Sequence, residues 1–259
     1  MKYSSLKATF LLALAGVMLA STAANAATTA YTQGNLILGF RSGTALTSVI
    51  VNLGASSVYR DGTAINSITS AADFDTEMAT VFGANWYTDG SVKWGIVSGL
   101  NGVGAVGIDN AKTLYGSKEQ AVYGTSGTPY SAQSSANQGT IATQIANMGS
   151  AYTGQTFTGT GFVQANSVTN SWNSRMAANE FGNNAWDLEG TVGSGSQLDL
   201  FRMEPTGGDA TSYEGSFKID SDGAVTFGNT PFGGAAVPEP SRALLLGLGL
   251  GGLFLRRRR

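Results

Sequence analysis

The sequence predicts a mainly β fold: a single antiparallel, β-sandwich-like domain with two short helices. Short runs rich in Val, Ile, Leu and aromatic residues alternate with glycine-containing turns between residues 34 and 228. Glycine occurs 36 times in 259 residues, only 12% of residues are charged and 42% are hydrophobic. Such a composition is typical of a turn-rich packed domain rather than of a disordered chain. Because the chain has no cysteine, burial of apolar side chains has to stabilise it without disulfides.

The first half of this region contains four predicted strands. Residues 34–41 and 47–53 are apolar enough to be buried strands, separated by a turn at Gly43. Residues 91–98 alternate between apolar and polar positions, which places Trp94 on the core face. Residues 112–117 are expected to form the neighbouring strand. Residues 58–68 suggest a short hairpin or edge segment.

Two helices are predicted from apolar spacing. Ser70 begins a capping box that ends at Asp73, and Phe74, Met78 and Phe82 follow at intervals of four residues. This pattern indicates a helix from about Ala71 to Phe82. Apolar residues at a similar spacing indicate a second helix from Thr140 to about Met148.

The second half of the domain is again predicted to be β structure. Residues 157–165 and 168–172 are expected to be short strands. Residues 197–203 alternate, with Leu198 and Leu200 on one face and Arg202 as a further candidate for that face. Residues 213–227 form a predicted hairpin around the turn Asp220-Ser221-Asp222-Gly223. No domain boundary is indicated, so residues 27–228 are expected to form one exported domain, followed by a flexible spacer at residues 229–236.

The first 26 residues have the pattern of a secretory signal peptide. Lys2 and Lys7 provide the positive segment, and residues 8–20 are apolar. The small residues Ala24 and Ala26 define a cleavage site for signal peptidase, which leaves Ala27 as the first residue of the mature chain. We therefore expect export across a membrane.

Residues 237–259 combine three features in a fixed order. The motif Val237, Pro238, Glu239 and Pro240 is followed by an apolar run at residues 243–255 and by Arg256, Arg257, Arg258 and Arg259. As a helix the apolar run would be about 20 Å long, shorter than the ~30 Å hydrocarbon core of a bilayer. The terminal arginines favour the cytoplasmic side and can extend a short span by snorkelling. We expect a transmembrane segment, the alternatives being a core helix or a disordered end.

This tail resembles the PEP-CTERM sorting signal of Gram-negative bacteria. In that family an exosortase-type membrane protease recognises the tail and is thought to cut near Pro-Glu-Pro, and the carriers are often found alongside exopolysaccharide and biofilm synthesis. Segments such as LGF and VNLG in the domain are also similar to uncharacterised PEP-CTERM proteins. The resemblance implies export across the inner membrane, transient membrane anchoring, and a final location at the cell surface or outside the cell. Arg242, between the motif and the apolar run, is the one departure from the pattern.

The charge of the exported domain differs from that of the whole chain. The chain has 15 basic and 17 acidic residues, a net charge of −2. Two lysines lie in the signal peptide and five arginines follow Pro240, so eight basic residues remain between Ala27 and Pro238. Sixteen acidic residues remain there, which gives a net charge of −8. A domain of this sign is a poor candidate for binding nucleic acid or anionic lipid.

The residue types predict no catalytic site, metal site or cofactor. The chain has no histidine and no cysteine, which removes the commonest zinc ligands, the usual base of a catalytic triad and any thiol nucleophile. Residues 102–107 spell a dinucleotide-binding pattern without the helix that such a site needs next. The turn Asp220–Gly223 resembles the start of a calcium loop, but Ala224 and Pro231 replace two required ligands, so a plain hairpin turn is the better interpretation.

We therefore expect a non-enzymatic, structural or adhesive protein associated with exopolysaccharide or biofilm. The alternative is a secreted carbohydrate-binding module, for which Trp86 and Tyr87 are tentative glycan contacts because aromatic rings stack on sugars. The least favoured interpretation is a glycan hydrolase that uses two carboxylates, since no motif selects a pair.

Overall fold

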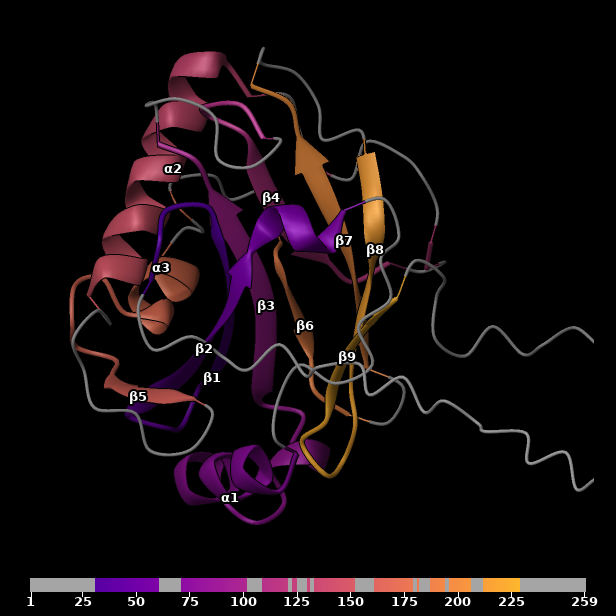
Figure 1. Ribbon diagram of the computed structural model, residues 1–259. Helices are drawn as coiled ribbons and strands as arrows, with labels where there is room; N and C mark the ends of the chain where they lie inside the picture. The colour runs from indigo at the N-terminus through magenta and orange to yellow at the C-terminus, as the bar shows by residue number, and fades with distance from the viewer. Residues whose placement is uncertain are drawn as a thin grey trace, which may run out of the picture.

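The computed structural model describes most of the predicted domain as one curled antiparallel sheet with helices packed around it (Figure 1). The described residues are 31–60, 71–101, 109–120, 123–124, 130, 133–151, 161–178, 181, 187–193, 196–205 and 212–228. Their strands are β1 (Asn35–Ser42), β2 (Thr47–Ala55), β3 (Val92–Gly99), β4 (Leu114–Lys118), β5 (Phe162–Ala165), β6 (Glu189–Thr191), β7 (Gln197–Met203), β8 (Ser212–Ile219) and β9 (Val225–Gly228). Their helices are α1 (Ala71–Phe82), α2 (Ser135–Ser150) and α3 (Trp172–Ala178), with two short 3-10 helices, η1 (Ser56–Tyr59) and η2 (Trp86–Thr88).

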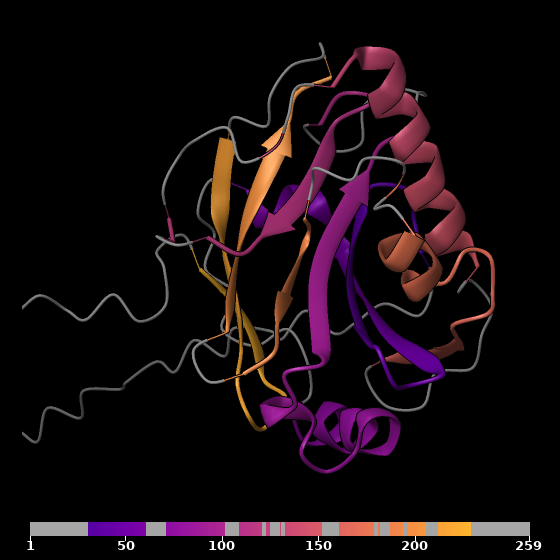
Figure 2. The ribbon, with the colours of Figure 1, turned by 180° about the vertical axis from the view of Figure 1, so that it is seen from behind.

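The strands follow the order β5-β2-β1-β3-β4-β7-β8-β9, with every neighbouring pair antiparallel. One edge of β3 is shared, because β6 pairs with residues 93–95 and β4 with residues 97–99. The sheet curls into a half-barrel, so that β7–β9 turn back toward β1 and β2 (Figures 1 and 2). The predicted mainly β, antiparallel class is confirmed. One continuous curled sheet replaces the two stacked sheets of a sandwich.

The inner face of the half-barrel buries an apolar cluster that connects its two ends. Phe40 on β1 packs against Phe74 of α1, with ring centroids 5.4 Å apart. Tyr59 of η1 packs against Phe217 and Phe227 of the opposite wall at 5.5 and 5.2 Å. Such aromatic pairs contribute about 0.5–1.5 kcal/mol each beyond the area that they bury. Tyr59 of η1, which follows β2 directly, therefore ties the first strands to the last ones, and α1 packs on β1.

The outer face is covered by α2 and α3 (Figure 2). The side chain of Ser134 caps α2 by accepting a hydrogen bond from the backbone N–H of Asn137 at 3.2 Å. Helix α2 lies close to β3, because Gly99 leaves space for the backbone of the helix. A Cβ atom at Gly99 would lie 2.8 Å from the Cα atom of Ala142.

Helix α3 is fixed by the indole of its first residue. The ring of Trp172 lies over Gly39 of β1 and Gly95 of β3, where side chains would otherwise stand. Its Nε1 donates a hydrogen bond to Glu189 Oε1 at 2.9 Å. Because the two glycines have no side chains, the Trp172 ring can pack directly on the strand backbone. The hydrogen bond to Glu189 orients the ring.

Most predicted elements agree with the structure. The bounds of α1 and β7 are confirmed, Trp94 is fully buried, and the hairpin of β8 and β9 is present. Helix α2 begins five residues before the predicted Thr140, because its first turn is polar and depends on the cap rather than on apolar spacing. The predicted strand at 168–172 is wrong. Val168 is exposed in a turn, and Trp172 begins α3.

We predict that Gly39→Ala destabilises the domain strongly, whereas Gly43→Ala is close to neutral. A Cβ atom at position 39 would lie 2.0 Å from the Trp172 ring, but one at position 43 meets nothing within 4 Å. Overpacking of this kind costs about 1–3 kcal/mol or more. Urea unfolding of both variants measures the difference. Equal unfolding midpoints for the two variants would show that packing of the Trp172 ring does not require glycine at position 39.

Candidate functional site

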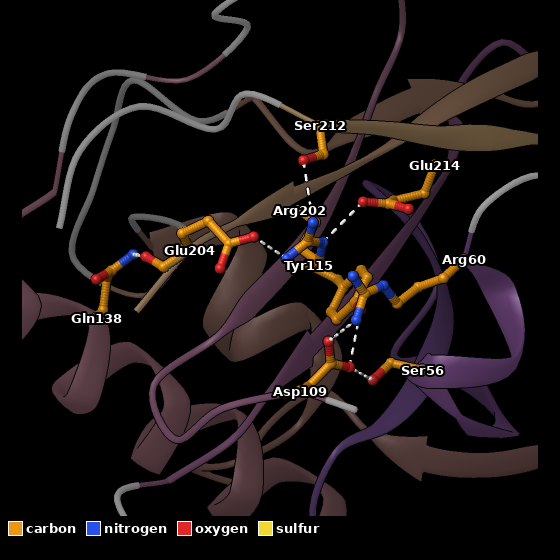
Figure 3. A network of polar contacts seen from close by, with 9 residues as sticks. All are labelled: Ser56, Arg60, Asp109, Tyr115, Gln138, Arg202, Glu204, Ser212 and Glu214. Carbon is orange, nitrogen blue, oxygen red and sulfur yellow. Dashed lines mark hydrogen bonds and ion pairs between the residues drawn. The ribbon is translucent and has the colours of Figure 1, made fainter. Parts of the chain in front are cut away.

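A largely buried network of polar side chains joins η1, β4, β7, β8 and α2 (Figure 3). This polar network consists of Ser56, Arg60, Asp109, Tyr115, Gln138, Arg202, Glu204, Ser212 and Glu214. It contains two arginines, each paired with a buried carboxylate, and the side chain of Tyr115 lies beside both.

The first pair is formed by Arg60 and Asp109. Arg60 Nη1 lies 2.9 Å from Asp109 Oδ1, and the Asp109 side chain is only 1% exposed. The hydroxyls of Tyr115 and Ser56 donate to Asp109 Oδ2 at 2.8 and 3.4 Å. Burial, reinforced by the negative charge of Asp109, raises the pKa of Tyr115 well above its usual value. Tyr115 therefore remains a hydroxyl donor and holds the buried carboxylate.

The second pair is formed by Arg202 and Glu214. Arg202 Nε donates to Glu214 Oε1 at 2.8 Å, and the Glu214 side chain is 3% exposed. Arg202 also forms an ion pair with Glu204 and donates to Ser212 Oγ at 3.2 Å. Burial alone would lower the pKa of Arg202, but the hydrogen bond to Glu214 and the two nearby carboxylates raise it overall. The guanidinium is therefore a fixed positive charge with acceptors on several sides.

Strand register explains why these side chains meet. Tyr115 is opposite Arg202 across β4 and β7, and Arg202 is opposite Ser212 across β7 and β8. The register between β7 and β8 shifts by one residue: Leu200 pairs with Gly215, whereas Phe201 pairs with Tyr213. Glu214 is the extra residue on β8. A bulge of this kind redirects a side chain, here toward Arg202. Gln138 adds α2 to the polar network, because its Nε2 donates to the carbonyl oxygen of Glu204 at 2.6 Å.

Only one residue of the polar network, Arg202, could have been singled out from the sequence. Arg202 stands on the buried face of an alternating strand, so a charged partner could have been expected for it. Nothing in the sequence points to Glu214 as that partner. Arg60 and Asp109 are 49 residues apart, and no spacing rule connects them.

A further arginine–carboxylate contact, outside the polar network, lies beside Trp172. Arg41 Nε donates to both carboxylate oxygens of Glu189 at 2.9 and 2.8 Å, and its Nη2 lies 2.6 Å from Oε2. Because Glu189 also accepts from the Trp172 indole, this contact joins β1, β6 and α3. Charge-assisted fork contacts of this type are geometrically specific and favour one arrangement of the elements.

Asp199 is a fully buried acid that is held by neutral donors. Ser216 Oγ and the backbone N–H of Gly124 donate to its two oxygens at 2.5 and 2.7 Å. Burial raises the pKa of Asp199, and these hydrogen bonds oppose the shift. The hydroxyl of Tyr213 lies 2.8 Å from Ser216 Oγ, so the hydrogen-bonded side chains around Asp199 continue along β8.

The tentative glycan contacts need correction in one respect. Trp86 is only 1% exposed, and its Nε1 donates to Asp75 Oδ1 at 2.8 Å. Its ring belongs to the inner core and cannot stack on a sugar in this arrangement. Tyr87 is half-buried, packs edge-on against Trp86 and donates to the carbonyl oxygen of Ile219 at 3.3 Å. The sequence could not distinguish the two rings, because adjacent residues in a 3-10 turn differ widely in burial.

The turn after β8 is a hairpin turn, as predicted. Gly223 adopts a positive φ of 83°, and its N–H donates to the carbonyl oxygen of Asp220 at 3.0 Å. Asp222 accepts from the backbone N–H of Ala224 at 3.1 Å, and Lys218 pairs with Asp220 at 2.7 Å. Within the described residues, no group of three or more acidic side chains could hold a metal ion.

Several features that the sequence analysis singled out lie outside the described residues. They are the signal-peptide cleavage site (Ala24, Ala26 and Ala27), the segment 102–107, the spacer 229–236, the sorting motif (Val237, Pro238, Glu239 and Pro240), the apolar run 243–255 and the arginines Arg256 to Arg259. The helices in the described part of the chain are too short or too polar to cross a bilayer. No protein-family model matches the chain, and comparisons with curated proteins and with solved structures found no match.

We predict that Arg202→Ala lowers the free energy of unfolding by about 3–5 kcal/mol, because it leaves Glu214 buried without its counter-charge. The matched control is Lys218→Ala, which removes a partly exposed pair with Asp220 and should cost less than about 1 kcal/mol. Urea unfolding of both variants tests this. The double variant Arg202→Met with Glu214→Leu removes both charges and should be more stable than Arg202→Ala. A loss in Arg202→Ala no larger than in Lys218→Ala would contradict a structural role for the buried pair.

Proposed function

We propose that this chain is an exported surface or extracellular-matrix protein of a Gram-negative bacterium, sorted and cleaved by an exosortase-type protease. Its β domain has a non-enzymatic, structural or adhesive role associated with exopolysaccharide or biofilm. The observation that carries the proposal is the order of the three parts of the tail. The tail begins with Pro-Glu-Pro at residues 238–240, continues with the apolar run at 243–255 and ends with four arginines at 256–259. Only Ser241 and Arg242 lie between the motif and the apolar run.

The signal at the other end of the chain supports the same destination. Residues 1–26 have the charge, apolar segment and small-residue cleavage site that signal peptidase requires. The two signals differ in chemistry and lie more than 200 residues apart, so neither follows from the other. Together they favour a precursor that is exported first and held by its tail afterwards.

The position of the last strand is compatible with removal of the tail. β9 ends at Gly228, and residues 229–236 separate it from Val237. Cleavage near Pro-Glu-Pro would therefore remove no residue of the described sheet. The domain could keep its inner and outer cores after it leaves the membrane.

The described domain suits a scaffold role because its buried charges bind one another. Arg60, Arg202 and Arg41 each pair with a buried carboxylate and join elements that are distant in sequence. The exported span carries a net charge of −8, which favours neutral or cationic polymers over anionic ones as matrix contacts. A neutral polysaccharide is therefore the matrix component that we would test first. Saturable binding to it would favour the carbohydrate-binding alternative over a purely structural role.

We predict that protein released from cells lacks both residues 1–26 and the segment 244–259, as measured by intact mass. Replacement of Pro238, Glu239 and Pro240 by alanine should leave the tail attached and keep the protein in the membrane fraction. The matched control is Asn229→Ala in the spacer, which should be processed normally. A released species that still contains residues 244–259 would refute processing at this motif.

A further inference from the structure

Helix α1 covers one end of the half-barrel (Figure 1). It carries one acidic side chain that is buried, Glu77. Phe74 and Met78 of α1 are fully buried in the inner cluster. Glu77, one residue before Met78, is only 8% exposed although its side chain is ionisable. The acid is therefore enclosed in the contact between the helix and the sheet.

Among the described residues, only one oxygen of the Glu77 carboxyl group has a hydrogen-bond partner. Its Oε2 accepts a hydrogen bond from the backbone N–H of Gly161 at 2.7 Å, whereas its Oε1 is buried and has no partner in that part of the chain. The Glu77 carboxyl group is closely packed against Gly161. A Cβ atom at Gly161 would lie 2.6 Å from Oε2 and 2.9 Å from Val49 Cγ1. An ionised carboxylate has about four acceptor positions to satisfy, whereas a protonated one has fewer and is less costly to bury.

The charged residues of the described elements around α1 do not compensate a negative Glu77. Strand β2 contains no charged residue, and neither does the sequence from 151 to 170, which includes Gly161 and β5. The other charged residues of α1 are Asp73 and Asp75, both acidic, and Asp75 accepts from Trp86 of η2. On β1, Arg41 is bound to Glu189. Lys93 at the start of β3 is exposed to solvent. Burial accordingly raises the pKa of Glu77 to about 7, although the Gly161 hydrogen bond acts in the opposite direction.

We propose that α1 is a pH-sensitive cap on the half-barrel, seated by the neutral carboxyl group of Glu77 and loosened when that group ionises. When α1 is detached, Glu77 is exposed to water and titrates near its usual pKa of 4.5. The seated helix therefore binds the proton more tightly than the detached one. Seating is strongest below about pH 4.5, weakens as the pH rises toward 7, and changes little above that. Phe74 and Met78 of α1 are buried against the sheet while the helix is bound. Detachment of α1 therefore exposes apolar surface at one end of the domain.

Hydrogen exchange of the full chain in detergent tests this cap. We predict that the opening constant of the α1 amides, corrected for intrinsic exchange, rises on the order of 100-fold between pH 5 and pH 8. Glu77→Gln keeps the size and the acceptor but cannot ionise, so its opening constant should stay unchanged over this range. Asp75→Asn, two residues away on the same helix, should behave like the wild type.

Two results would overturn the proposal. One is a wild-type opening constant that does not change with pH, and the other is a Glu77→Gln variant with the wild-type pH dependence. If Glu77→Gln fails to fold, carbon NMR of the Glu77 carboxyl in the wild-type chain replaces it. A titration midpoint near 7 is expected there, and one near 4.5 would exclude the cap. Neither measurement depends on whether the chain is sorted or cleaved.

Discussion

The pairing of β4 with β7 is the contact on which the rest of the fold depends. It joins the strands of the first half of the chain to the closing β7–β9 meander through five opposed residue pairs, from Leu114 with Met203 to Lys118 with Asp199. The polar network crosses this same seam, because Tyr115 and Arg202 face each other there. The Arg60–Asp109 pair lies on the β4 side of the seam, with Tyr115 as a second donor to Asp109, and the Arg202–Glu214 pair lies on the β7–β8 side. The two ion pairs therefore flank the junction that the backbone pairing closes.

Regular patterns predicted the elements, and they failed where the pattern changed. Alternation was sufficient for β7, and four-residue spacing was sufficient for α1, because each buries one continuous face. Helix α3 was missed because its role depends on Trp172 lying over two glycines that are far away in sequence. The curl of the sheet could not be predicted either, since η1 and Tyr59 reach the opposite wall through contacts that only tertiary structure brings together.

Buried charge in this domain takes two forms with different physical consequences. Asp109, Glu189 and Glu214 face arginines, so their burial is compensated by an opposite charge. Asp199 and Glu77 accept hydrogen bonds from neutral donors, and burial raises the pKa of each. The first group fixes the arrangement of elements. The second makes part of the domain sensitive to proton concentration, which the sequence does not reveal by itself.

The three internal arginine pairs also determine how copies of the domain meet one another. They occupy Arg41, Arg60 and Arg202, three of the eight basic residues between Ala27 and Pro238, together with three buried acids: Glu189, Asp109 and Glu214. Five basic and 13 acidic residues are left for the rest of that span. Copies should therefore repel one another in dilute solution and approach more closely as salt shortens the Debye length, roughly 10 Å at 0.1 M. Ionic strength, rather than any complementary patch of basic residues, would then set how densely such domains accumulate.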